Sequence, residues 1–215
     1  MQRFFIITAS LFVCLLFLLP QEGGSAQLKH SLEKYRGSQV SKKSLQRLAP
    51  FNKYINYYSQ FTFFKPRHKV NPDFIRALIL AESDANPRAV SSKSAMGLGQ
   101  IIYSTGKQAA LELSRCRFRF RYISKNKLRN LQKRDLFDPE INILLTCYLI
   151  SKYNYKFRGK LELVLTAWNA GEYQKELSQG KVASYPETQD LVGKVNSYYI
   201  DLLKRRTRIA SRDRR

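Results

Sequence analysis

Apolar residues recur at helical spacing along most of the chain, and one predicted helix carries an acid on its apolar face. Three apolar residues stand seven, four and three positions before Glu82, spacings that place side chains on one side of a helix. They are Ile75, Leu78 and Ile79. A carboxylate among such neighbours must find partners, become protonated or take part in chemistry, because an unpaired buried charge is costly. Desolvation would also raise its pKa, which suits a general acid near neutral pH.

The residues around this stripe define the ends of its helix. Asn71 is a suitable N-cap, and Pro72 is a suitable first helical residue. The pair Asn86-Pro87 disfavours helical backbone, so we expect the helix to end before it. A serine-rich loop then leads to Gly97-Leu98-Gly99-Gln100, where two glycines indicate backbone that turns sharply or lets a ligand approach closely.

The pattern predicts further helices in the second half of the chain. Asp138 and Pro139 can cap and open a helix that is apolar almost all round, which indicates the buried centre of the domain. A helix over residues 161–170 is stopped by Gly171, and the last helix begins near Thr188. The fold class is therefore mainly α.

The N-terminus has the pattern of an export signal. Residues 1–3 are short and positive, residues 4–19 are apolar, and a polar segment ends in Gly24-Ser25-Ala26. We predict a signal peptide over residues 1–26 that is cut after Ala26; uncut, it would be a rather short membrane anchor. The bulky residues before Cys14 do not fit a lipoprotein signal. This pattern predicts a periplasmic or secreted protein associated with the cell envelope.

Residues 27–66 form a predicted N-terminal helical extension. Its aromatic residues Tyr54, Tyr57, Tyr58 and Phe61 lie at helical spacing. Such a stripe is more typical of core packing than of a ligand platform. Pro66 marks the link to the main domain, over residues 67–203.

The chain is strongly basic, with 38 Lys and Arg against 16 Asp and Glu and a net charge of +22. This excess predicts an anionic partner: nucleic acid, an anionic membrane face or an acidic polymer. The export signal disfavours nucleic acid.

Two segments concentrate the charge. Between Arg117 and Tyr122 arginines alternate with other residues, which predicts a strand or extended loop with one charged face. This basic stretch, residues 114–134, is either an anion-binding rim or a solvated insertion. Residues 204–215 hold seven basic residues and one acid, a composition typical of a disordered tail that adheres to polyanions or makes peripheral membrane contact.

The cysteines and histidines give little sign of metal chemistry. Cys116 and Cys147 remain after cleavage, and in an oxidising compartment they could form a disulfide worth about 3–4 kcal/mol. Two free thiols are the equal alternative. His30 and His68 are not at zinc-like spacing, so we expect no metal site and no cofactor.

Several short motifs occur in one order over about 130 residues, and together they resemble the lytic transglycosylase domain of the lysozyme-like superfamily, which cleaves the glycan strands of bacterial peptidoglycan. The motifs are Glu82-Ser83, the stretch 86–91, the loop 95–100, Ser104-Thr105, the stretch 136–143, the stretch 167–171 and the stretch 185–188. The resemblance implies a lysozyme-like helical domain with a buried central helix and a small lobe of loop and strand lining the cleft. It implies peptidoglycan glycan strands as the partner, and a cell-envelope or secretion complex could recruit the protein.

The resemblance also implies roles for individual residues. Glu82 would protonate the oxygen between N-acetylmuramic acid and N-acetylglucosamine, then accept the proton of the C6 hydroxyl as it attacks C1, which leaves a 1,6-anhydro end. Substrate-binding positions are implied at Ser83, Gln100, Trp168, Asn169 and Glu187, the last at the back of the cleft. Two positions depart from the family pattern: Leu98 replaces a common Met, and Trp168 replaces the usual tyrosine, which puts efficiency or substrate range in question.

The distribution of acids favours a mechanism with one carboxylate. No Asp or Glu lies between Ala85 and Leu111, and Asp84, two positions after Glu82, is on a different helix face. Two-carboxylate glycosidases need a second acid across the bond. The alternatives are a hydrolytic muramidase similar to goose-type lysozymes, a non-catalytic module for wall binding or secretion assembly, and killing of cells through the cationic tail.

Overall fold

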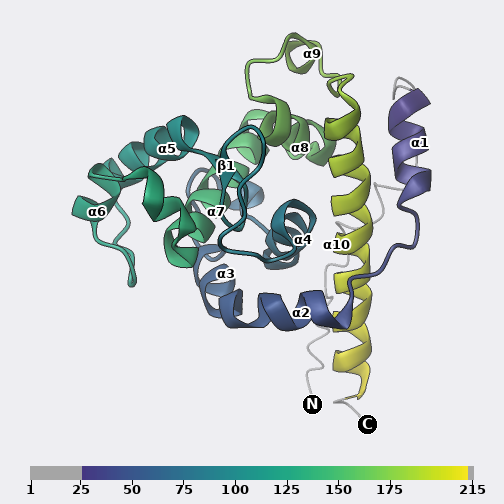
Figure 1. Cartoon of the computed structure of the whole chain (residues 1–215), viewed down its shortest axis with the longest axis horizontal. Helices are drawn as coiled ribbons and strands as arrows, with labels where there is room; N and C mark the ends of the chain where they lie inside the picture. Colours follow the sequence, from purple (N-terminus) through teal and green to yellow (C-terminus); the bar gives the residue numbers. More distant parts are fainter. Residues whose placement is uncertain (1–25, 213–215) are drawn as a thin grey trace, which may run out of the picture.

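The structure, a computed structural model, describes residues 26–212, so the predicted signal peptide lies outside the described residues except for Ala26. The described chain is built from helices and one short two-stranded sheet (Figure 1). In chain order the elements are α1 (Ala26–Lys34), α2 (Lys42–Leu48), η1 (Ala49–Phe51), α3 (Asn52–Tyr58), η2 (Pro66–His68), α4 (Pro72–Ser83), β1 (Ala95–Met96), β2 (Ile101–Ile102), α5 (Tyr103–Arg115), α6 (Lys125–Arg129), η3 (Lys133–Phe137), α7 (Pro139–Lys156), α8 (Leu161–Ala170), α9 (Lys175–Ser178) and α10 (Pro186–Arg212).

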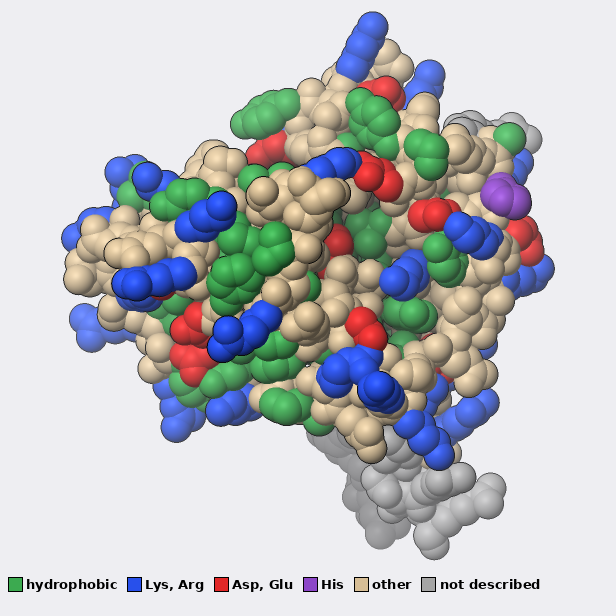
Figure 2. All heavy atoms as spheres, in the orientation of Figure 1, with side chains coloured by type: hydrophobic (Ala, Val, Ile, Leu, Met, Phe, Trp, Pro, Cys, Tyr) green, Lys and Arg blue, Asp and Glu red, His purple; other side chains and the backbone are tan. Residues whose placement is uncertain are grey.

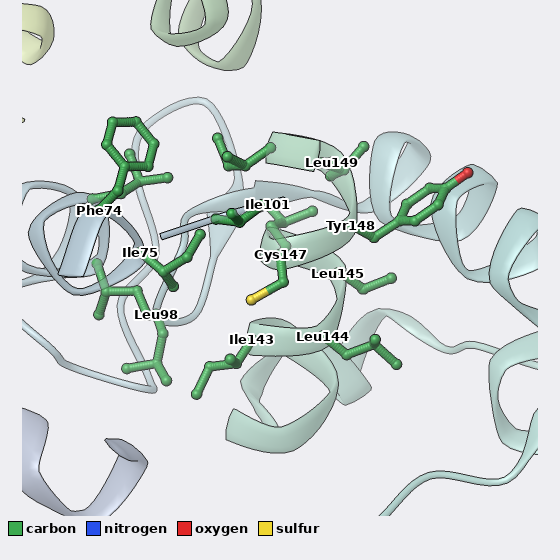
Figure 3. Packing of buried hydrophobic residues seen from close by; sticks show 14 of the residues in the cluster. Phe74, Ile75, Leu98, Ile101, Ile143, Leu144, Leu145, Cys147, Tyr148 and Leu149 are labelled. Atoms are coloured by element: carbon green, nitrogen blue, oxygen red, sulfur yellow. The ribbon is translucent and has the colours of Figure 1, made fainter. Parts of the chain in front are cut away.

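Helix α7 is the buried centre of the fold, as the sequence predicts. The Asp138 carboxylate accepts a hydrogen bond of 2.9 Å from the backbone N–H of Glu140, and Pro139 opens the helix. Twelve of its 18 residues are buried. Figure 3 shows Cys147 on the side of Ile75 and Leu98, whereas the side chains of Leu144, Leu145 and Tyr148 point the other way. A helix that is apolar all round is thus covered all round.

Helix α4 also begins and ends as predicted. The side-chain oxygen of Asn71 accepts from the backbone N–H of Asp73 at 2.8 Å. Ile75, Leu78 and Ile79 are fully buried. The helix ends at Ser83, because Asp84 takes a left-handed conformation with φ of 51°.

The glycine loop is fastened to α7 by one side chain. Strands β1 and β2 pair antiparallel, and residues 97–100 form the turn between them. The Asn142 amide oxygen accepts from the backbone N–H of Gly99 at 2.8 Å. Its nitrogen donates to the carbonyls of Met96 at 3.0 Å and Leu136 at 2.8 Å. The glycines therefore allow close approach of the loop backbone to helix α7 and to the Leu136 carbonyl of η3.

The N-terminal extension packs along α10, the long helix at the right of Figure 1. The Ser31 hydroxyl of α1 donates to the backbone carbonyl of Gln189 at 2.7 Å. Further along, the hydroxyl of Ser197 donates to the carbonyl of Ser38 at 3.0 Å. On its other side α10 contacts α4 and α8, so that α10 joins the extension to the main domain.

The aromatic stripe of the extension forms part of the core, as predicted. Tyr58 is fully buried, and Tyr57 lies edge-on to Tyr122 with ring centroids 5.2 Å apart. The basic stretch returns to this cluster as an extended loop: Phe120 is buried there, whereas the arginines at positions 117, 119 and 121 are exposed. The alternation predicted for this stretch is therefore present, without a strand.

The cysteines do not form the disulfide that we considered. Both are free: Cys147 is buried and Cys116 is half-buried. The Cys147 sulfur points toward Ile75 and Leu98, whereas the Tyr148 side chain points the other way (Figure 3). Cys116, which follows α5, lies near the phenol of Tyr148. Because neighbouring side chains on a helix point in different directions, Cys147 does not face the Tyr148 side where Cys116 lies.

The predicted disordered tail is largely helical. Helix α10 continues through Lys204 as far as Arg212, where the described residues end. The Arg205 guanidinium pairs with Asp201 one turn earlier at 2.8 Å, and Arg206 pairs with Asp73 of α4 at 3.4 Å. Within residues 26–212, no helix combines the length and the apolar character needed to span a membrane.

The glycine loop gives a test of this packing. In Gly97→Ala a Cβ would stand 2.2 Å from the Leu136 carbonyl oxygen. Gly37 has the same φ of +74° but no atom within 4 Å, so Gly37→Ala is the matched control. We expect Gly37→Ala to lose about 1–2 kcal/mol of unfolding free energy, and Gly97→Ala to lose about 3 kcal/mol or more. Urea unfolding measures both, and equal losses would contradict the role given to the close contact.

Candidate active site

Glu82 lies in the last turn of α4, where the apolar face of the helix reaches the surface. Burial of the three preceding residues of this face leaves the carboxylate with little water, although its side chain remains partly accessible to solvent. Figure 2 shows the molecular surface hollowed in the middle of this view, with acidic and hydrophobic atoms in the hollow and Lys and Arg side chains around it.

Trp168 is the hydrogen-bond partner of this acid. Its indole Nε1–H donates to Glu82 Oε1 at 2.7 Å. Trp168 lies near the C-terminal end of α8, and Gly171, with φ of 94°, ends that helix. The tryptophan that replaces the usual tyrosine thus still supplies a donor, and it binds the acid itself.

A lysine from α10 completes the surroundings of Glu82. Lys194 Nζ donates to the backbone carbonyl of Ala81 at 3.0 Å, next to Glu82 in the chain. Its positive charge lowers the pKa of Glu82, while burial lowers the pKa of Lys194 itself. The lysine is half-buried, so its charge acts through a medium of lower polarity than water.

Burial dominates the acidity of Glu82. It raises the pKa of the carboxyl from 4.5 to about 7, and the hydrogen bond from Trp168 and the charge of Lys194 oppose this rise. At neutral pH the group therefore exists in both forms. It can donate a proton and take one back, as a general acid and base must.

Two predicted substrate-binding residues are occupied in holding the glycine loop. The Ser83 hydroxyl donates to the Leu98 carbonyl at 2.7 Å. The side-chain amide of Gln100 donates to the carbonyls of Gly97 at 2.9 Å and Ala89 at 3.2 Å. Ser83 is the last residue of α4, and Gln100 ends the glycine loop. Both side chains hold backbone groups of this loop in place.

The other two lie on either side of the contact between the end of α8 and the start of α10. The Asn169 side-chain oxygen accepts from the Thr188 hydroxyl at 2.6 Å, which links the end of α8 to α10. The Glu187 side chain is 54% exposed, and it pairs with Lys93 of the loop before β1. This pair joins α10 to the loop across the face of the molecule.

The sequence reasoning missed Asn142 and Lys194. Asn142 is an amide inside the apolar run of α7, a position where a buried polar group needs partners. Lys194 stands three positions after Leu191 and four before Tyr198, so it lies on the apolar face of the last helix. Each residue stands out as a polar group in a local apolar pattern, but that pattern does not say which segment the side chain contacts.

Among residues 26–212 there is no group of three or more His, Cys, Asp or Glu side chains placed to hold a metal ion. The site instead consists of one desolvated carboxylic acid with a neutral donor and an ammonium group near it.

A sequence model described as the Transglycosylase SLT domain matches residues 61–190, and the chain belongs to this family. Its structure resembles that of the 70 kDa soluble lytic transglycosylase of Escherichia coli, with a TM-score of 0.54 and 18% identity over 80% of this chain and 29% of that one.

Curated relatives carry related names. The chain is 34% identical over 141 residues to a Haemophilus influenzae protein with the provisional name soluble lytic murein transglycosylase, covering 60% of this chain and 22% of that protein. It is 34% identical over 113 residues to membrane-bound lytic murein transglycosylase C of Edwardsiella ictaluri, covering 49% and 28%. The chain therefore spans only about a quarter of the length of these relatives.

The pKa of Glu82 predicts a pH-dependent stability. Below pH 4.5 the carboxyl is protonated in both the folded and the unfolded chain. As pH rises to about 7 the unfolded chain ionises first, so Glu82 destabilises the fold increasingly, by at most about 3 kcal/mol. We expect Glu82→Gln to unfold at a higher urea concentration than the parent at pH 8, and at a similar one at pH 4. A difference that does not depend on pH would contradict this pKa.

Removal of the indole donor gives a second test. Trp168→Phe keeps a ring but loses the N–H that stabilises the Glu82 anion, so the pKa of Glu82 should rise above that of the parent. Carboxyl ¹³C NMR titration measures it, with the signal assigned by its loss in Glu82→Gln. Tyr173→Phe, at a side chain 87% exposed, is the control and should leave the titration unchanged. An unchanged or lowered pKa in Trp168→Phe would contradict the hydrogen bond.

Proposed function

We propose that this protein is a peptidoglycan lytic transglycosylase that cleaves the β-1,4 bond between N-acetylmuramic acid and N-acetylglucosamine. The observation that carries the proposal is Glu82, a desolvated acid whose pKa is raised to about 7. Membership of the family supports the substrate class.

The reaction uses Glu82 twice. The protonated carboxyl donates its proton to the glycosidic oxygen as the bond to C1 breaks, and N-acetylglucosamine leaves as the alcohol. The carboxylate then accepts the proton of the C6 hydroxyl while that oxygen bonds to C1. The product is a 1,6-anhydromuramyl end, water is not consumed, and the acid returns to its first state. A pKa near the working pH suits both half-reactions.

The neighbours of Glu82 support the anionic half of this cycle. Once the proton has left, the indole N–H of Trp168 and the charge of Lys194 stabilise the carboxylate. These stabilising groups are an indole and an ammonium, so they add no second carboxylate to the site.

The surroundings favour one acid over two. A second carboxylate about 5 Å away, as in retaining glycosidases, would raise the pKa of Glu82 by repulsion. Burial is the one cause that raises it among the described residues. Asp84 is exposed and pairs with Arg47, and Glu187 pairs with Lys93.

The remaining predicted residues form the frame of the substrate site in this proposal. Ser83 and Gln100 fix the loop that faces the glycan, and Asn169 and Glu187 fix the start of α10 opposite it. The basic surface would meet the acidic peptide stems of peptidoglycan. We place the protein at the cell envelope, because the signal pattern predicts export and peptidoglycan lies there. A secretion complex and peripheral membrane contact are further proposed partners.

The end groups of digested sacculi test the reaction. The parent should release muropeptides with 1,6-anhydro ends, and Glu82→Gln should lower the rate about 100- to 10,000-fold while still binding sacculi. The rate of the parent should fall above pH 7 because the acid loses its proton. Mass spectrometry reads the ends, and Glu33→Gln, at an exposed glutamate of α1, is the control.

The outcomes separate the candidates. Reducing muramic ends would replace the proposal with a hydrolytic muramidase. Binding of sacculi without any release, in the parent as in Glu82→Gln, would leave a non-catalytic wall-binding module.

A further inference from the structure

The last turn of α4 is held from both sides by cations that lie outside the matched family region, residues 61–190. The carbonyls at the end of a helix have no partner within it, and the helix dipole favours positive charge there. Lys194 of α10 donates to the carbonyl of Ala81 at 3.0 Å. From the opposite end of the chain, Arg47 of α2 donates through Nε to the carbonyl of Asp84 at 2.9 Å. Glu82 lies between these two anchored peptide groups.

Arg47 holds a turn that is costly to form. Its Nη2 also pairs with the Asp84 carboxylate, so that one guanidinium bridges the backbone and the side chain of the same residue. Asp84 and the next residue, Ala85, both have left-handed backbone, with φ of 51° and 60°. Left-handed conformations of residues other than glycine cost about 1–2 kcal/mol each and persist only where neighbours enforce them.

The arginine itself is held in place. Nη2 donates to the Ser44 hydroxyl at 3.3 Å, one turn earlier in α2. The chain just before α2 is fastened to α10, because the backbone N–H of Val40 donates to Asp201 at 3.0 Å and Arg205 donates to the Val40 carbonyl at 2.9 Å. The segment that carries Arg47 is therefore anchored on α10, the helix that also carries Lys194.

We propose that Arg47 and Lys194 are positioning residues for the reaction, and that the catalytic unit includes the N-terminal extension and the C-terminal half of α10. This rests on the proposed function of Glu82. Arg47 fixes the turn that follows the acid, and Lys194 fixes the peptide that precedes it. Together they set the direction in which the carboxyl projects, to which proton transfer is sensitive.

Variants of Arg47 test the proposal. Arg47→Met removes both donors and should lower the maximal rate of anhydromuropeptide release by about 10- to 100-fold, with little change in the sacculus concentration that gives half this rate. Arg47→Lys keeps the charge but cannot bridge two acceptors, and it should recover only part of the rate. Arg36→Met is the matched control, because Arg36 forms an exposed ion pair with Glu33 on the same extension.

Folding must be separated from positioning. Rates are compared per folded molecule, below the onset of thermal unfolding of every variant. Amide hydrogen exchange at residues 83–86 should speed up in Arg47→Met, whereas exchange along α7 should not change. Lys194→Met should raise the pKa of Glu82 in the NMR titration, because a nearby cation is lost.

The results decide between the possibilities. A parental rate per folded molecule in Arg47→Met, or an equal loss in Arg36→Met, would overturn the positioning role of Arg47. An unchanged pKa of Glu82 in Lys194→Met, together with a parental rate, would overturn that of Lys194. If the parent forms no anhydro ends, the proposed function fails instead, and the exchange and titration results still show whether the two cations hold Glu82.

Discussion

The buried amide of Asn142 is the interaction on which the rest of this fold depends. It lies in the first turn of the apolar helix α7, is fully buried, and makes three hydrogen bonds to backbone groups of β1, the glycine loop and η3. A buried amide without partners would destabilise the fold, so the amide and the loop require each other. The close contact leaves no room for a side chain at Gly97.

The fixed glycine loop links the position of Glu82 to the packed core. The Ser83 hydroxyl joins the end of α4 to the Leu98 carbonyl, so that the position of the loop defines the position of the helix end. On the opposite side, Trp168 comes from α8, which packs against both α7 and α10. Glu82 is thus placed by elements that share one core, although its carboxyl remains partly accessible. Its raised pKa follows from that placement.

Sequence patterns predicted the features that depend on residues close together in the chain. The ends of α4 and α7 follow from an asparagine, an aspartate and prolines within a few residues of each helix start, and apolar spacing gave the buried faces. Glu82 could be singled out for the same reason. The contacts of Arg47 and Lys194 could not be predicted, because their partners lie 37 and 113 residues away and no local spacing encodes such pairs. Nor could the sequence decide between a disulfide and two free thiols, because distance along the chain does not tell which way a thiol points.

The parallel packing of the extension on α10 has a consequence for how the molecule forms. The contacts of α1 and of the segment before α2 join residues about 160 positions apart, among the most distant in the chain. Closure of such large loops is slow, and the extension cannot make these contacts before α10 has been synthesised. Arg47 can therefore clamp Asp84 in a supported position only after the segment before α2 has docked on α10, so the turn that follows Glu82 becomes ordered late in folding.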